Sequence, residues 1–166
     1  MEWLILIVLI IGLALFLLRR KAVVSEAVVS ENYPYDKHST LFSAAERSFY
    51  GVLCQAAEGK AVVFGKVRVG DVLKTKKGLN ASERQKAFNR ISAKHFDFVL
   101  CKPDDLSVMA AVELDDSSHD SKKRMERDEF LEGASEAAQL KLHRFKARNS
   151  YIIDEVRKEL FSNGNY

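Results

Sequence analysis

The sequence predicts a mixed α/β domain that follows one N-terminal transmembrane helix. Beyond residue 40, segments with apolar residues at helical spacing alternate with short runs rich in valine, phenylalanine and leucine, which is typical of α/β folds. Residues 3–18 carry no charged side chain and are almost entirely apolar. The 166 residues, of which 47% are hydrophobic and 30% charged, suit one globular domain with a short extension.

The apolar run at residues 3–18 predicts a membrane anchor. It lies near the short end for a membrane-spanning helix, and Arg19 to Lys21 follow it directly. Positive charge after the run, and not before it, argues against a cleaved signal peptide and places the rest of the chain in the cytoplasm. We therefore expect an anchor with a basic flank over residues 1–21, single-pass, with its N-terminus outside and residues 3–18 in the lipid bilayer. A buried helix is the alternative, but it would need a large partner to cover it.

Neither residues 22–40 nor the two cysteines carry a functional motif. The segment 22–40 is expected to be a linker, because its duplicated Ala-Val-Val-Ser-Glu sequence is too short for a repeat fold and Pro34 breaks any helix. Cys54 and Cys101 are too few for a disulfide framework, and we expect two reduced thiols. The net charge of +3 is too small to identify a nucleic-acid partner.

The first half of the domain is expected to form a helix, a strand, a basic loop and a second helix. Ser43 and Glu46 have the spacing of a capping box, and apolar residues at helical spacing follow them. Residues 61–69 are rich in valine and phenylalanine and predict a strand. Residues 73–78 predict the basic loop, and residues 82–92 predict a polar helix.

The second half is expected to begin with an antiparallel hairpin. Residues 95–101 and 108–114 are short apolar runs separated by a turn, and alternation would place Phe96, Phe98 and Leu100 on one face. A charged helix at 122–139, a strand at 140–145 and a helix at 151–161 complete the order. The domain is thus expected over residues 41–150, with a C-terminal helix and tail over 151–166.

Acidic residues interrupt or end both strands of the predicted hairpin. Asp97 lies within the first strand and Glu113 near the end of the second, so strand pairing can bring them to one edge of the sheet. Two carboxylates, completed by water and a substrate phosphate, are what Mg²⁺ prefers, and bound Mg²⁺ can activate water for hydrolysis. Asp115 could add a ligand, and His119 could act as a general base or as an acid for the leaving group. The alternative is an ordinary polar turn after a strand.

The arrangement of these acids resembles the PD-(D/E)XK nuclease superfamily, and in particular an uncharacterised bacterial domain family near the very-short-patch-repair endonucleases. The resemblance covers residues 41–148. It is carried by Asp97, by the string Glu113 to His119 after a gap of 16, and by Arg127-Asp128 on the next helix. It implies a restriction-endonuclease-like three-layer core with a mixed central sheet. It also implies a Mg²⁺ ion, with Mn²⁺ as a substitute, a DNA substrate with RNA as the alternative, and a bacterial inner membrane as the location of the anchor.

Carried over residue by residue, the resemblance makes Asp97 and Glu113 the metal carboxylates and Glu46 a supporting acid. The capping box alone also explains a glutamate at 46. Asp115 stands where the superfamily motif has lysine, and this departure puts the standard mechanism in doubt. The lysine function then falls to His119, Lys122 or Lys123.

Two basic clusters are candidates for contacts with nucleic-acid phosphates, although most charge runs are simply solvated faces. They are Lys74, Lys76 and Lys77 in the basic loop, and Lys141, Arg144 and Lys146 around the last strand. The leading hypothesis is accordingly a Mg²⁺-dependent DNA nuclease. A catalytically inactive nucleic-acid-binding or scaffolding module is the alternative, and a protein-interaction domain is a third.

Overall fold

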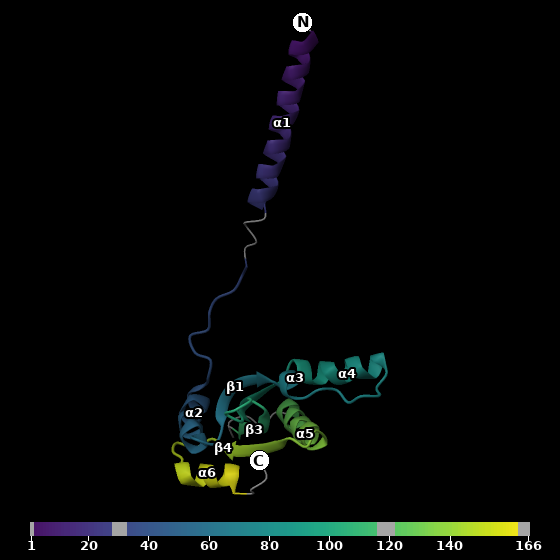
Figure 1. Cartoon of the computed structure of the whole chain (residues 1–166). Helices are drawn as coiled ribbons and strands as arrows, with labels where there is room; N and C mark the ends of the chain where they lie inside the picture. The colour runs from purple at the N-terminus through teal and green to yellow at the C-terminus, as the bar shows by residue number, and fades with distance from the viewer. Residues whose placement is uncertain (1, 28–32, 116–121, 163–166) are drawn as a thin grey trace. The chain divides into compact units, whose positions relative to one another are not determined.

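The computed structural model describes residues 2–27, 33–115 and 122–162, shown in Figure 1. The chain divides into two units, Met1–Ser39 and Thr40–Tyr166. The first unit contains α1 (Glu2–Ala27), which continues past the apolar run into the segment expected to be a linker. The second unit contains all the remaining helices and the sheet.

The predicted membrane anchor is wrong, and so is the bacterial inner-membrane location inferred from it. Across the part of the chain that the structure describes, no helix is both long and apolar enough to cross a membrane. Residues 3–18 would give only about 24 Å of helix, short of a hydrocarbon core of roughly 30 Å. The same helix continues directly into Arg19, Arg20 and Lys21.

A four-stranded mixed sheet forms the centre of the second unit, with the strand order β1-β2-β3-β4. Its strands are β1 (Val62–Arg68), β2 (His95–Cys101), β3 (Val108–Asp115) and β4 (Lys141–Lys146). The first three strands are antiparallel neighbours, whereas β4 runs parallel to β3. The mixed α/β class and the hairpin of β2 and β3 are thereby confirmed.

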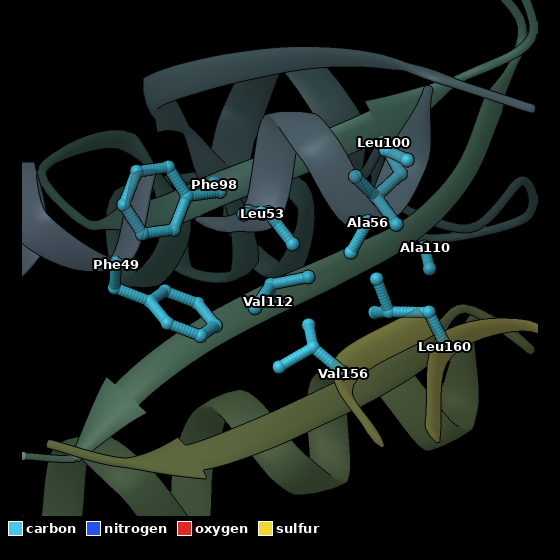
Figure 2. Packing of buried hydrophobic residues seen from close by; sticks show 10 residues of the cluster. Phe49, Leu53, Ala56, Phe98, Leu100, Ala110, Val112, Val156 and Leu160 are labelled. Carbon is cyan, nitrogen blue, oxygen red and sulfur yellow. The ribbon is translucent and has the colours of Figure 1, made fainter. Parts of the chain in front are cut away.

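Helices cover both faces of the sheet and make three layers (Figure 1). On one face lie α2 (Ala44–Ala57) and α6 (Ile153–Phe161), and on the other lie α3 (Val69–Val72), α4 (Ala81–Ser92) and α5 (Lys122–Ala137). Figure 2 shows the first core, in which Phe49 and Leu53 of α2 meet Phe98 of β2 and Val156 of α6. As expected, α2 begins at the capping box of Ser43 and Glu46.

One strand departs from the expected alternation. Phe98 and Leu100 pack in the core under α2, but Phe96 packs in the opposite core with Val99. The departure coincides with a break in the ladder between β1 and β2, because Gly65 pairs with Phe98 and Val67 with Phe96 while the position between them is unpaired. That position in β1 is Lys66, whose φ of 55° is in the left-handed region and disturbs the pleat.

Candidate active site

Asp97 and Glu113 lie side by side where the hairpin ladder ends. The last residue pair in the ladder of β2 and β3 is Phe98 with Val112. Beyond it, the two strands are joined by hydrogen bonds from backbone N–H groups to side-chain carboxylates. The backbone N–H of Asp97 donates to Glu113 Oε1 at 3.2 Å, and the N–H of Leu114 donates to Asp97 Oδ2 at 3.0 Å. Each acid is thus fixed by the strand that carries the other, as the expected convergence requires.

Glu113 is the more buried acid, with a side chain 3% exposed. Arg127 of α5 donates through Nη2 to Glu113 Oε2 at 3.0 Å, and the same nitrogen reaches the carbonyl of His95 at 3.2 Å. Burial and the negative charge of Asp97 nevertheless raise the pKa of Glu113 to about 7, because Arg127 compensates them only in part. Arg127 therefore offsets the negative charge of Glu113 only in part.

Lys66 is a site residue that the sequence analysis missed. Its Nζ lies 2.5 Å from Glu46 Oε1 and 3.3 Å from Asp97 Oδ1, so it joins α2 to β2. Burial would lower the pKa of Lys66, but the hydrogen bond to Glu46 and the charge of Asp97 outweigh it and raise that pKa. Lys66 is therefore a cation held against Asp97.

Glu46 has two roles in this arrangement. It completes the capping box, with its Oε2 accepting from the N–H of Ser43 at 2.8 Å, and its other oxygen binds Lys66. Burial would raise the pKa of Glu46, but the bonds from Lys66 and Ser43 lower it overall. The structure thus places Glu46 beside the acidic pair, one cation away from Asp97.

An open cavity of ≈ 670 Å³ adjoins the acidic pair. The charged side chains in its wall are Lys66, Lys94, Asp97 and Arg127, and Leu41, Ala93 and His95 complete the lining. Lys66 and Arg127 are paired with carboxylates, so Lys94 is the cation of this wall that is left to attract a negatively charged ligand.

Asp115 lies apart from this arrangement, in an ion pair with Arg144 of β4. Arg144 Nε and Nη2 bind the two carboxylate oxygens of Asp115 at 3.0 and 2.5 Å. Arg144 also lies 3.3 Å from Asp128 Oδ2, and Asp128 in turn binds Arg127 Nη1 at 3.1 Å. Asp115 therefore connects β3 with β4, and Arg144, which was expected to contact phosphate, is already paired with carboxylates.

The other expected site residues fall in two groups. His119 lies outside the described residues, and the side chains of Lys122 and Lys123 are not described either. Lys74, Lys76 and Lys77 are exposed on the loop that runs along α4 (Figure 1). Lys141 is half-buried and Lys146 exposed on β4.

The residues present fit a metal ion bound by two carboxylates. Among the residues that the structure describes, no group of three or more His, Cys, Asp and Glu side chains could hold a metal. Magnesium usually keeps several waters and takes only one or two protein carboxylates with substrate oxygens. Asp97 and Glu113 meet that description, and a cation there would stabilise the charged form of Glu113, which burial and the negative charge of Asp97 disfavour.

Comparison with known families gives one result. The model of the family described as "Protein of unknown function (DUF2726)" matches residues 38–163. The chain belongs to this family. No curated protein and no solved structure matches the chain. The family match covers the sheet, its helices and the acidic pair, and it supports the expected membership of an uncharacterised domain family while naming no activity.

Proposed function

We propose that the DUF2726 domain of this chain hydrolyses phosphodiester bonds of DNA with a divalent metal ion, in the manner of the PD-(D/E)XK nucleases that it resembles. The single observation that carries the proposal is the mutual fixation of Asp97 and Glu113 at the end of the hairpin, beside a cavity lined with cations. A three-layer α/β core with a mixed sheet is consistent with the restriction-endonuclease-like fold.

In this proposal Asp97 and Glu113 hold Mg²⁺ or Mn²⁺, which when bound polarises the phosphate and lowers the pKa of a coordinated water. The remaining roles belong to side chains of the cavity wall. Arg127 keeps Glu113 in position and offsets part of its negative charge. Lys66 supplies a positive charge next to Asp97, where phosphate oxygens would gather charge during the reaction.

In this proposal Lys66 also supplies the positive charge that a lysine at position 115 would provide. Residue 115 points its carboxylate at Arg144, so that part of β3 contributes no cation to the acidic pair. The ammonium group comes from β1 instead, and Glu46 acts as the residue that positions it. A lysine delivered from another strand can stabilise the same developing charge, because the electrostatic effect depends on distance and not on chain position.

One observation favours the second candidate function, a DNA-binding module without catalysis. Each of the four carboxylate oxygens of Asp97 and Glu113 already accepts a hydrogen bond, from Lys66, Leu114, Asp97 and Arg127. The acidic pair is thus satisfied by the protein itself, and these bonds could serve only to fix the hairpin.

The two functions are separated by a cleavage assay with a parallel metal titration. The full-length chain is incubated with supercoiled, duplex and single-stranded DNA in Mg²⁺, in Mn²⁺ and in EDTA, and Mn²⁺ binding is measured by calorimetry. We expect metal-dependent cleavage that Asp97→Asn and Glu113→Gln abolish, together with Mn²⁺ binding. Asp104→Asn, which removes an exposed acid in the turn between β2 and β3, is the matched control and should change neither. Absence of cleavage with intact binding of DNA in EDTA would leave only the second function.

A further inference from the structure

Two cations at the junction of α4 and α5 are fixed in place without a carboxylate partner. The guanidinium carbon of Arg90 lies 4.4 Å from the centroid of the Phe130 ring, and Nζ of Lys94 lies 4.9 Å from the same centroid. Within the described part of the chain, neither forms an ion pair, unlike Arg127 and Arg144. Contact with an aromatic ring orients a cation and leaves its hydrogen-bond donors available.

These cations continue the candidate site along the surface. Lys94 is in the wall of the cavity that contains Asp97, and Arg90 precedes it by four residues. Lys86, which is exposed on α4, lies four residues before Arg90, or about one helical turn. Lys94 follows the end of α4 by two residues. The single acid of α4 is Glu83, at the N-terminal end of the helix, where its carboxylate accepts a hydrogen bond from the backbone N–H of Asn80 in a capping box.

Arg90 and Phe130 also line a cavity that contains two acidic side chains. This second cavity, of ≈ 700 Å³, is lined by Arg90 and Phe130 together with Glu126 and Glu129 of α5. A phosphate chain would be repelled by these glutamates and attracted by the cations of α4. The cations of this junction come from α4 and from the residues just after it, whereas the glutamates come from α5.

We propose that Arg90 and Lys94, followed by Lys86, form the surface that binds the phosphate backbone of the DNA strand entering the Asp97 cavity. This inference rests on the proposed function for its substrate, and it assigns a surface different from both basic clusters that the sequence suggested. Arg90 presents a fork of donors that fits a phosphate, and Lys94 places a charge between that contact and Asp97. Phosphate contacts of this kind set the position of a strand and carry no sequence information.

The test measures DNA binding by the full-length chain in EDTA, so that it does not depend on cleavage. A fluorescent duplex oligonucleotide is titrated at several salt concentrations with wild type, with Arg90→Gln/Lys94→Gln and with Lys102→Gln/Lys158→Gln. The last variant removes two exposed positive charges, from the turn after β2 and from α6. Arg90→Lys/Lys94→Arg keeps both charges and shows whether charge alone is sufficient.

We expect Arg90→Gln/Lys94→Gln to weaken binding roughly tenfold or more, and to make the slope of log K against log salt shallower by about 2. The charge-matched Lys102→Gln/Lys158→Gln should change affinity less than about twofold, and the charge-conserving variant should restore most of the affinity. Equal affinities for the two neutralised variants, or no binding by wild type, would overturn the inference. Cleavage that continues alongside equal affinities would leave the nuclease standing without this surface. Binding that depends on Arg90 and Lys94 in a chain that never cleaves DNA would support the surface and refute the nuclease.

Discussion

Arg144 binds both carboxylate oxygens of Asp115, with its Nε 3.0 Å from Oδ2 and its Nη2 2.5 Å from Oδ1. The same guanidinium reaches Asp128, which is bound to Arg127, and Arg127 is bound to Glu113. Charges of alternating sign thus connect β4 to the buried acid of β3. Asp115 is thus part of a network of ion pairs that supports the acidic pair, so we expect its loss to affect stability and to leave Asp97 and Glu113 in position.

A double-mutant cycle tests this brace. Asp115→Asn and Arg144→Gln should each lower the free energy of unfolding by about 1 kcal/mol, and the double variant should lose less than the sum, because a two-point ion pair is shared. The measurement is urea unfolding of the four proteins at pH 7. Mn²⁺ affinity should stay within about twofold of wild type in Asp115→Asn. The exposed pair of Arg68 and Asp71, whose side chains are 54% and 53% exposed, is the control and should show almost no coupling.

Glu113→Gln should stabilise the metal-free domain at neutral pH while removing metal binding. The pKa of Glu113 is raised from 4.5 to about 7, so its favourable contribution is complete below pH 4.5 and is lost as the pH rises through 7. The amide avoids a buried charge and should add about 3 kcal/mol to the free energy of unfolding above pH 7, and nothing below pH 4.5. Thermal or urea unfolding in EDTA measures the difference. An equal or lower stability of Glu113→Gln at pH 8 would contradict the buried, partly compensated carboxylate.

His143 should impose the opposite pH dependence. It is 4% exposed in β4, and burial together with the charge of Lys141 lowers its pKa from 6.5 to about 4. The folded protein favours the neutral imidazole of His143. The free energy of unfolding therefore falls by about 3 kcal/mol in total as the pH is lowered from 6.5 to 4. Between pH 4.5 and 6.5 the contributions of Glu113 and His143 nearly cancel. We expect a flat profile for wild type, a gain on acidification for His143→Gln and a loss for Glu113→Gln, all measured by urea unfolding across this range.

Lys66→Met should separate metal affinity from cleavage rate. Removing the ammonium leaves Asp97 with less positive charge beside it, so Mn²⁺ should bind more tightly by calorimetry. Cleavage of DNA should fall by about 100-fold or more, because the phosphate loses a stabilising charge. Lys66→Arg keeps a charge and should keep part of the rate, whereas an unchanged rate in Lys66→Met would remove this residue from the mechanism. Glu46→Gln, which only frees the lysine, should produce a smaller loss than Lys66→Met.

The order of the longer helices and of the strands was predictable because it depends on local patterns, whereas the short helix α3 was not predicted. The capping box of Ser43 and Glu46, and the two apolar runs of the hairpin, each depend on residues a few positions apart. The convergence of Asp97 and Glu113 followed from that hairpin, since antiparallel pairing of known register determines which positions face each other.

The features that the sequence did not predict depend on contacts between residues far apart in the chain, or on local backbone geometry that the spacing of apolar residues does not indicate. Lys66 meets Glu46 and Asp97 across 20 and 31 positions, and its only signal was a lone charge within the apolar run 61–67. Its left-handed backbone also lies at the break in the ladder that accompanies the unexpected placement of Phe96. The membrane anchor was predicted from the composition of residues 3–18. Their apolar run is too short to form a helix that crosses a membrane.

Lys66 has a further consequence because β1 is an edge strand of the sheet. Val62 and Phe64 are 36% and 39% exposed on that edge, and a regular apolar edge strand invites pairing with the same strand of another molecule. A left-handed, positively charged residue in the middle of the strand interrupts the row of donors and acceptors that such pairing needs. We therefore expect the residue that brings a cation to Asp97 also to oppose pairing of β1 with the same strand of another molecule.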